Sequence, residues 1–296
     1  MFIRQNFGSY DYDNLADFLD NQNSSFSDFD RSFSLVDQTT GDDTEAAAKF
    51  KAMQLAFYAQ DEWQTSDHFK LNLGLRLDIP IFTTTPAQNQ YFNNTTTPLL
   101  EAQGYDLKGA TVGTAPKAAL MFSPRVGFNW NIDGEGDIQL RGGIGIFTSR
   151  IPLVWPGGMY NNNGRTVGGT GAGSGTFNPD PLNQPNGGAT IPLPPNDPGS
   201  GQIDIFAENF KFPQLLRASA AVDKKLPWGL VGTAEVIWSK TLNNIFYETV
   251  NLAPSTVNLT NGGDTRPKYE RNFAGGSIDN TFTAVYLGSN TSDGYG

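Results

Sequence analysis

Residues 53–82 read MQLAFYAQDEWQTSDHFKLNLGLRLDIPIF and form two long alternating segments joined by a short polar turn. In the first segment apolar residues occupy every second position, interrupted only by Asp61 beside the turn, and are Met53, Leu55, Phe57, Ala59 and Trp63. In the second segment the apolar positions are Phe69, Leu71, Leu73, Leu75, Leu77, Ile79 and Ile81. Because successive side chains of a strand point to opposite faces, this period of two predicts a β-hairpin with one apolar face.

The length of these segments is the next clue to the fold. Each runs for about a dozen residues, whereas a strand of a soluble sandwich usually has about five or six and a tilted membrane strand roughly nine to eleven. The other face carries Arg76 and Asp78, which suit the wet lumen of a transmembrane barrel better than a dry core. A soluble sheet with one solvated face gives the same alternation, so this hairpin alone leaves both interpretations open.

The same pattern returns twice, which favours the barrel. Hairpins are predicted at 51–82, 118–148 and 215–241, with polar turns that include NIDGEG and KKLPWG. In the second hairpin we place Met121 with Val126, Phe128 and Trp130 on the apolar face, and Pro124 at a strand start or bulge. The segment FTAVYLG begins a further strand for which the sequence shows no partner.

Long irregular stretches separate the hairpins. Residues 83–117, 148–206 and 243–280 are rich in Thr, Pro, Asn or Gly and are predicted to be extracellular loops, opposite short periplasmic turns. The longest lacks the apolar content for a core of its own, so we expect it to be mobile and to gate the mouth of the barrel. Residues 1–50 are expected at a rim, with a short helix capped by Asp13 that carries Leu15, Phe18 and Leu19 on one face, then a short strand at FDRSFSLV.

Composition excludes several classes of protein. The net charge of −10, with 20 scattered Lys and Arg, argues against a nucleic-acid partner. The absence of Cys excludes disulfides and thiol chemistry. No run of eighteen apolar residues predicts a membrane helix, which says little about a barrel because alternating strands average out. Six strands cannot close a transmembrane barrel, and no signal-peptide pattern follows Met1, so we expect a part of a longer protein that lacks its N-terminus here.

Catalytic and metal sites are not expected, and we predict that the protein is not an enzyme and has no cofactor. The single histidine, His68, lies in a turn. Asn131, Asp133 and Glu135 have the spacing of a calcium loop, but the twelfth position is Gly142, so we interpret NIDGEG as a turn. Three tryptophans beside short turns predict an aromatic girdle, and they are Trp63, Trp130 and Trp228.

Ligand contacts are expected from two sets of residues. The loop aromatics that could stack on sugars or dock peptides are Tyr91, Tyr105, Trp155 and Tyr160. The candidates on the polar face of the strands are Arg76 and Arg141. We expect ligand specificity to lie mainly in the loops, because strand positions are constrained by lipid on one face and lumen on the other.

The strand segments also resemble a known family. FYAQDEW followed by a short turn and LNLGLRLD resembles a strand pair of TonB-dependent outer-membrane receptors. FSPRVGFNWNIDGEGDIQLRGGIGIF and FKFPQLLRASAAVDKKLPWGLVGTAEVIWSKTLNNI are similar to the Oar-like branch, whose members carry a carboxypeptidase-regulatory-like domain. The resemblance covers about half the chain and implies a 22-stranded barrel, a plug and a TonB box elsewhere, and energised import of an unknown ligand. The implied partners are outer-membrane lipid, the TonB complex and that extracellular ligand.

The alternative function is a soluble all-β adhesion or carbohydrate-binding module. Both readings predict an all-β antiparallel fold. They differ in what covers the apolar face of the strands, which is lipid in a barrel and protein in a soluble module.

Overall fold

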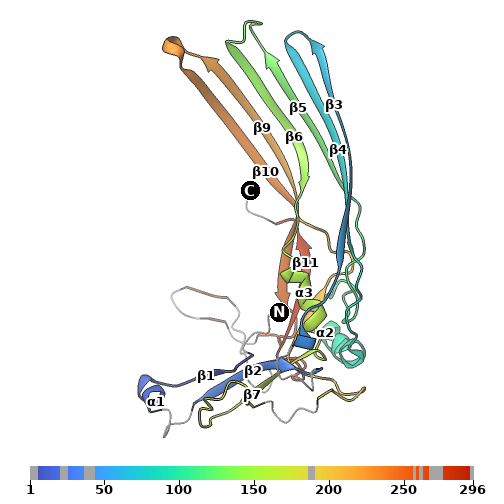
Figure 1. Cartoon of the computed structure of the whole chain (residues 1–296), viewed down its shortest axis with the longest axis vertical. Coiled ribbons are helices and arrows are strands. Elements are labelled where there is room, and N and C mark those ends of the chain that lie inside the picture. The colour runs from blue at the N-terminus through green and yellow to red at the C-terminus, as the bar shows by residue number, and fades with distance from the viewer. Residues whose placement is uncertain are drawn as a thin grey trace.

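Long antiparallel strands form a tall, curved wall that stands on a layer of packed loops (Figure 1). The computed structural model describes residues 6–20, 26–36, 44–185, 191–255, 258–259, 263–266 and 276–293. The six wall strands are β3 (Ala52–Ser66), β4 (Phe69–Phe82), β5 (Met121–Asn131), β6 (Ile138–Thr148), β9 (Gln214–Lys225) and β10 (Val231–Thr249). The three hairpins predicted from the alternation are therefore present, and their strands have 11 to 19 residues.

The wall follows the order of the sequence. Its sheet has the strand order β3-β4-β5-β6-β9-β10-β11-β8, in which neighbours from β3 to β11 pair antiparallel. The three short turns all lie at one end, and the last of them holds the 3₁₀ turn η3 (Pro227–Gly229) (Figure 1). The long connections lie at the other end. Within the described part of the chain the sheet is open, with β3 at one edge, so it does not close into a barrel by itself.

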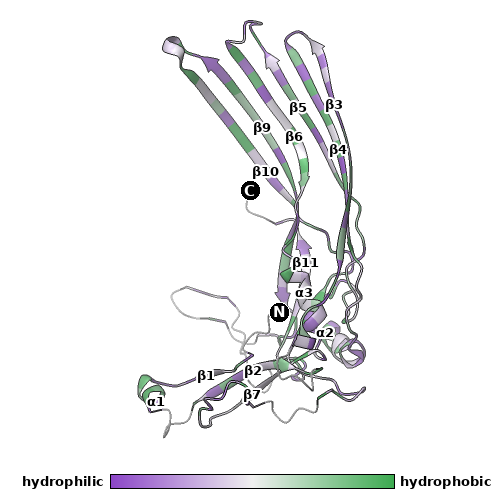
Figure 2. Cartoon of the chain, in the orientation of Figure 1, coloured by the Kyte–Doolittle hydropathy of each residue, from purple (hydrophilic) through white to green (hydrophobic). Residues whose placement is uncertain are grey.

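Register brings the apolar side chains of neighbouring strands onto one face. Phe57 pairs with Leu77, which pairs with Phe122 on the next strand. This face is exposed: Phe57 keeps 62% of its surface, Phe122 52% and Ile144 50%. Figure 2 shows the resulting alternation of hydrophobic and hydrophilic residues along the wall.

The loop layer covers the polar face at the loop end of the wall only, and Arg125 and Arg217 further along this face are exposed. Near the loop end, Asp78 and Ser123 are buried on this face at 1% and 0% exposure. A soluble sheet would bury its apolar face and leave the polar face to water. The wall instead leaves its apolar face exposed, as a membrane barrel does.

The sheet forks at Pro124. Pairing between β5 and β6 ends at Arg125 and Gly145, and beyond that point β5 pairs with β4 alone while β6 continues on β9. Proline has no N–H to donate to a ladder, which suits the residue where a partner strand is lost. Side chains bridge the fork instead: Ser123 Oγ lies 2.9 Å from Thr148 Oγ1, and Gln214 Nε2 donates to Thr148 Oγ1 at 2.9 Å and to Phe122 O at 3.2 Å.

Met121 differs from its predicted placement. It lies on the polar face in register with Asp78, is 1% exposed and packs in the loop layer, while Phe122 takes the apolar face. The sequence misled because Met121 precedes Pro124 and belongs to a loop core that periodicity does not reveal.

The loop layer contains regular structure of its own. A small sheet joins β1 (Ser9–Asp11), β2 (Asp28–Ser34) and β7 (Val167–Ala172). The other elements are α1 (Leu15–Leu19), η1 (Thr44–Ala46), the π-helical turn η2 (Phe92–Thr96), α2 (Thr97–Ala102), α3 (Val154–Asn161), β8 (Gln202–Phe206) and β11 (Ala284–Thr291). The predicted short helix is α1, but its N-cap is Asn14, whose side chain accepts from Asp17 N at 3.0 Å, and not Asp13.

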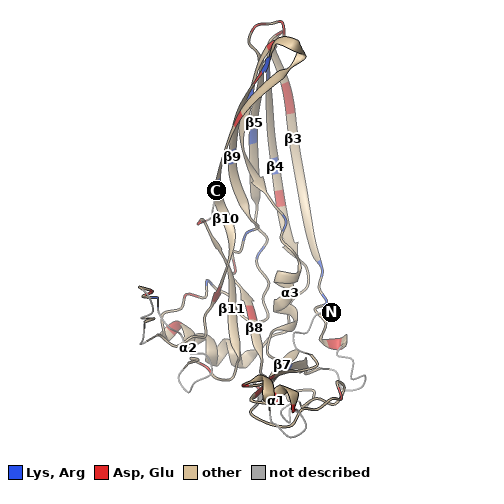
Figure 3. Cartoon of the chain, turned by 90° about the vertical axis from the view of Figure 1, so that its left-hand side faces the viewer, with Lys and Arg blue, Asp and Glu red and all other residues tan. Residues whose placement is uncertain are grey.

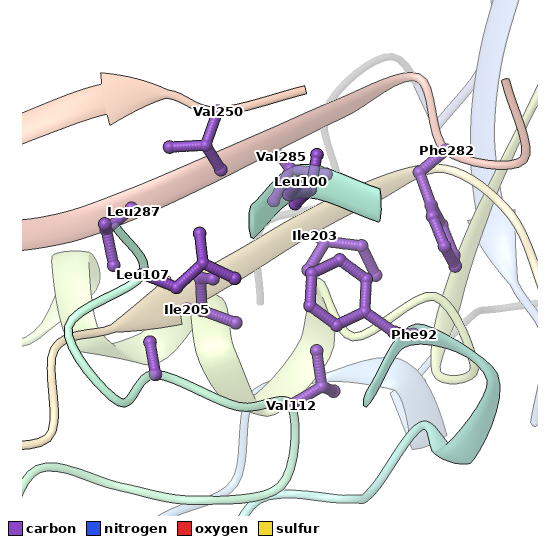
Figure 4. Packing of buried hydrophobic residues seen from close by; sticks show 11 residues of the cluster. Phe92, Leu100, Leu107, Val112, Ile203, Ile205, Val250, Phe282, Val285 and Leu287 are labelled. Carbon is purple, nitrogen blue, oxygen red and sulfur yellow. The ribbon is translucent and has the colours of Figure 1, made fainter. Parts of the chain in front are cut away.

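Two hydrophobic cores hold the loop layer together. The first combines Phe92, Leu100 and Leu107 from residues 83–117 with Ile203 and Ile205 of β8, and adds Val250, Phe282, Val285 and Leu287 (Figure 4). The second includes Ile151, Met159, Tyr160 and Phe206, together with Met121. The described residues of 148–206 form no core of their own but contribute Ile151, Met159, Tyr160, Ile203 and Ile205 to these shared cores, and the expected mobility of this loop stays a prediction. Each loop has few apolar residues, but residues from several loops together form these cores.

The expectation that the last strand lacks a partner is also corrected. β11 pairs antiparallel with β10, from Asn244 to Thr249, and parallel with β8 on its other side. β8 follows a Gly- and Pro-rich stretch, so no hairpin signal connects it with β11.

Candidate functional site

Charged residues lie on several strands of the wall (Figure 3), and the strand register assigns Arg76, Arg125, Arg141 and Arg217 to the polar face. One row of paired residues crosses all six wall strands and consists of Gln60, Gly74, Arg125, Gly145, Arg217 and Ser239. A hollow of 490 Å³ lies over this region, and its polar lining includes Asn72, Asn129, Arg125, Arg141 and Arg217. A second hollow of 320 Å³ adjoins it and is lined by Arg76, Arg125 and Arg150.

Two of these arginines are tied to carboxylates. Arg76 Nε and Nη2 each lie 2.8 Å from an oxygen of Asp78, which also accepts from Gln54 Nε2 at 2.9 Å. Arg141 Nε donates to Asp223 Oδ2 at 2.9 Å, and Thr233 Oγ1 donates to Asp223 Oδ1 at 2.7 Å. The two predicted wall candidates, Arg76 and Arg141, thus lie on the polar face as expected, each already neutralised by an acid.

Sequence reasoning missed Arg125 and Arg217 as site residues. Alternation alone puts both on the polar face, because each is flanked by apolar-face residues. What it could not show is that Gly145 of β6 lies between them in one row, since this requires the register of three strands.

Gly143 and Gly145 leave part of the polar face of β6 without side chains. A Cβ built on Gly143 would lie 2.7 Å from Val126 O, and one built on Gly145 would lie 2.9 Å from Cγ of Arg125. In β4, by contrast, a Cβ on Gly74 would meet no atom closer than 3.9 Å. The β6 glycines are therefore required by close contacts, and Gly145 provides the floor on which the Arg125 side chain lies.

The four predicted loop aromatics have different environments. Tyr160 is 7% exposed, stacks on Phe50 with a centroid separation of 4.4 Å and donates to Thr84 O at 2.9 Å. Tyr91 and Tyr105 pack against the first loop core, and Tyr105 donates to Leu252 O. Trp155 keeps 44% of its surface, which makes it the most accessible of the four to a ligand.

Burial changes the ionisation of two groups in the loop layer. It raises the pKa of Tyr160 to about 12. It also raises the pKa of Asp204 on β8, although hydrogen bonds from Asn162 Nδ2 at 2.8 Å and Gln202 Nε2 at 2.7 Å favour the carboxylate. Both side chains already have partners within the layer, so we assign them a structural role.

The predicted calcium-like spacing forms a turn. The carboxylate of Asp133 accepts from the backbone N–H groups of Glu135, Gly136, Asp137 and Ile138 at 3.0 to 3.3 Å. Its oxygens are therefore occupied by the turn itself. Among the residues that the structure describes, no three His, Cys, Asp or Glu side chains come together as a metal site.

The three tryptophans lie at the turn end of the wall and are exposed, Trp63 at 58%, Trp130 at 42% and Trp228 at 93%. Trp63 and Trp130 lie on the apolar face. From Met53 to Trp63 the apolar face of β3 extends about 33 Å along the strand, which a tilt of about 40° reduces to about 25 Å, the height of the apolar band of a membrane barrel.

Residues 3–292 match the family of the outer membrane beta barrel domain. The chain belongs to this family. No curated protein and no solved structure matches it. The family places the barrel domain in the outer membrane, and it favours lipid over a soluble partner as the cover of the exposed apolar face. Along the described ranges no helix of the barrel domain is long and apolar enough to cross a membrane.

Proposed function

We propose that this barrel domain is part of a TonB-dependent receptor that imports a ligand across the outer membrane. The supporting observation is the asymmetry of the fold: the wall has short turns at one end and a packed loop layer at the other, and that layer covers the loop end of the polar face. A receptor needs such a layer to bind ligand before passage. The resemblance of the first hairpin to TonB-dependent receptors, and of the second and third to their Oar-like branch, adds the proposal of a 22-stranded barrel with a plug.

The wall supports this proposal in a second way. Its open edges require further strands, because an unpaired edge in hydrocarbon leaves backbone groups without partners. We propose that further strands close a wide lumen, that a plug fills it, and that an energised step opens it for the ligand. We further propose that the protein has no enzymatic activity.

Energised uptake can be tested without knowing the ligand. Cells that express the full-length protein and cells that lack it would be grown in the same complex medium, and solute depletion would be followed by mass spectrometry. We expect at least one solute to disappear faster with the protein present, and this difference to vanish when a protonophore collapses the proton gradient. Depletion that survives the protonophore would identify a passive pore and refute import through TonB.

A further inference from the structure

We infer that the polar wall contains an anion-binding site built around Arg125 and Arg217, which takes a compact ligand with two or more carboxylate or phosphate groups. The two residues flank Gly145 in one row of the sheet. Two strand spacings separate their Cα atoms, which is about 10 Å. Arginine side chains are long enough to converge over the glycine between them.

Arg125 and Arg217 differ from the neighbouring arginines in having no acidic ion-pair partner among the described residues. Arg76 and Arg141 are held by Asp78 and Asp223, whereas neither Arg125 nor Arg217 forms an ion pair within the part of the chain that the structure describes. Of the other acids on the polar face, Glu62 is bound to Lys70 at 2.8 Å. Glu235 lies on β10 four residues before Ser239, the residue that pairs with Arg217, and thus about 13 Å along the strand.

The surroundings position Arg125, and Asp78, an acid near enough to interact with it electrostatically, is already bound by two hydrogen bonds from Arg76. Its guanidinium carbon lies 4.5 Å from the centre of the Phe147 ring, a contact that restrains the side chain and leaves its charge in place. The missing Cβ of Gly145 provides the space that the Arg125 side chain crosses, because an added Cβ would lie 2.9 Å from Cγ. Both arginines are exposed to the hollow, so a ligand can reach them.

The rest of the lining fits an oxyanion ligand. Asn72, Asn129 and Gln60 supply amide donors to the same hollow, and its volume of 490 Å³ suits a small molecule. Arg150, which also forms no ion pair along the described ranges, lines the adjoining hollow beside Arg125. A chain with a net charge of −10 thus presents a local cluster of unneutralised cations, and planar guanidinium groups bind carboxylate and phosphate through paired hydrogen bonds.

This inference deepens the proposed function, since an anion bound to the wall would lie on the import route. Binding would be measured by calorimetry on full-length protein purified from outer membranes in detergent, at low ionic strength. Citrate and pyrophosphate would be the probes, and maltose the neutral control. We expect saturable binding of citrate or pyrophosphate that weakens as salt is added, with the stronger of the two identifying carboxylate or phosphate as the preferred group.

Substitutions then locate the site. Arg125→Gln and Arg217→Gln should each weaken binding about tenfold, and the double variant about a hundredfold, because each loses a charge-assisted pair of hydrogen bonds. Arg266→Gln, whose arginine is paired with Asp264 in a loop, is the matched control and should bind as the parent does. Equal affinity in parent and double variant, or no binding of either anion by the parent, would overturn the inference.

A second measurement needs no variant. Phenylglyoxal modifies accessible arginines, and mass spectrometry of the digested protein reports the extent at each residue. Bound anion should protect Arg125 and Arg217 and leave Arg266 unprotected, whereas equal modification with and without anion would contradict the site. Neither measurement uses an energy source, so a failure of proton-driven uptake would leave the binding result intact. Absence of anion binding would equally leave import of a neutral ligand to be tested.

Discussion

Asp133 shows how one side chain can organise a turn of the wall. Gly134 and Gly136 adopt φ values of 76° and 78°, and four successive backbone N–H groups point back at the Asp133 carboxylate. Partial desolvation acts to raise the pKa of Asp133, but these hydrogen bonds outweigh it and hold the pKa below its usual range.

The turn should therefore loosen in acid. A carboxyl whose folded-state pKa is lowered stabilises the fold above its unfolded pKa of about 3.9, and this contribution is lost as the pH falls through the folded pKa. We expect amide hydrogen exchange at residues 135–138 in the parent, corrected for intrinsic rates, to accelerate below about pH 4. Asp133→Ala should exchange fast already at pH 7 and show no such acid step. A step of equal size in Asp133→Ala would mean that another group protects these amides.

Neighbouring residues on β4 test which face meets lipid. Leu73 lies on the apolar face and Asn72 on the polar face, one position apart. In the full-length protein, Leu73→Arg should impair assembly, because a charge facing lipid near mid-bilayer costs roughly 2–4 kcal/mol. Asn72→Arg is the matched control and should assemble normally, since the same charge would face water.

Heat-modifiable mobility on gels and the yield in outer membranes would measure assembly of both variants. If Asn72→Arg were the defective one, the faces would be assigned the wrong way round. Equal assembly of both would show that neither side of β4 contacts hydrocarbon.

At the scale of elements, α2 links the loop at 83–117 to the first loop core. Leu100 on α2 is 0% exposed within that core, whereas the adjacent Leu99 is 44% exposed. Leu100→Ala should destabilise the loop layer by about 2–5 kcal/mol through lost burial and the cavity left behind. Leu99→Ala should change its stability by less than about 0.5 kcal/mol.

Limited proteolysis in increasing urea would follow this difference. Cleavage within residues 83–117 should begin at lower urea in Leu100→Ala than in Leu99→Ala, while the wall strands stay protected in both. Simultaneous loss of the wall would show that loop layer and wall unfold as one unit.

The wall strands could be predicted from the sequence because two environments act on them at once. The alternation from Phe69 to Ile81 indicates which side chains face lipid and which face the lumen, and the turn residues limit where each strand ends. The loop layer has no such alternation in its sequence. Its cores pool a few apolar residues from distant segments, such as Phe92 with Ile203 and Leu287, and no local period marks those contacts.

The same difference between local pattern and long-range contact explains which features of the candidate site could be predicted from the sequence. The alternation of apolar and polar residues predicted that Arg76 and Arg141 lie on the polar face, and the structure places them there. Their acid partners could not be predicted equally well: Asp78 is two residues from Arg76, whereas Asp223 is 82 residues from Arg141. The pairing of Arg125 and Arg217 across Gly145 depends on strand register, and the burial of Tyr160 depends on the loop core; neither is encoded locally.

For the whole molecule, the orientation in the membrane is open to a direct test. We expect the short turns on the periplasmic side and the loop layer outside. Gly173 is a suitable labelling site in the loop layer, because a Cβ there would meet no atom within 4 Å, and Asp67 is exposed in the β3–β4 turn. On intact cells an impermeant maleimide should label Gly173→Cys, and it should label Asp67→Cys only after the outer membrane is permeabilised. The opposite pattern would reverse the orientation.

The fork at Pro124 has a mechanical consequence for the barrel. Around the rest of the wall, a change in perimeter would have to break a backbone ladder, which is cooperative along a whole strand. At the loop end, side chains connect β5 with β6 and β9 through the Ser123–Thr148 contact, the hydrogen bond from Gln214 to Phe122 O and the stacking of Arg125 on Phe147. Each is worth about 1 kcal/mol. The wall is therefore held least strongly between the loop ends of β5 and β6, and separating them there would leave β5 paired with β4 and β6 with β9.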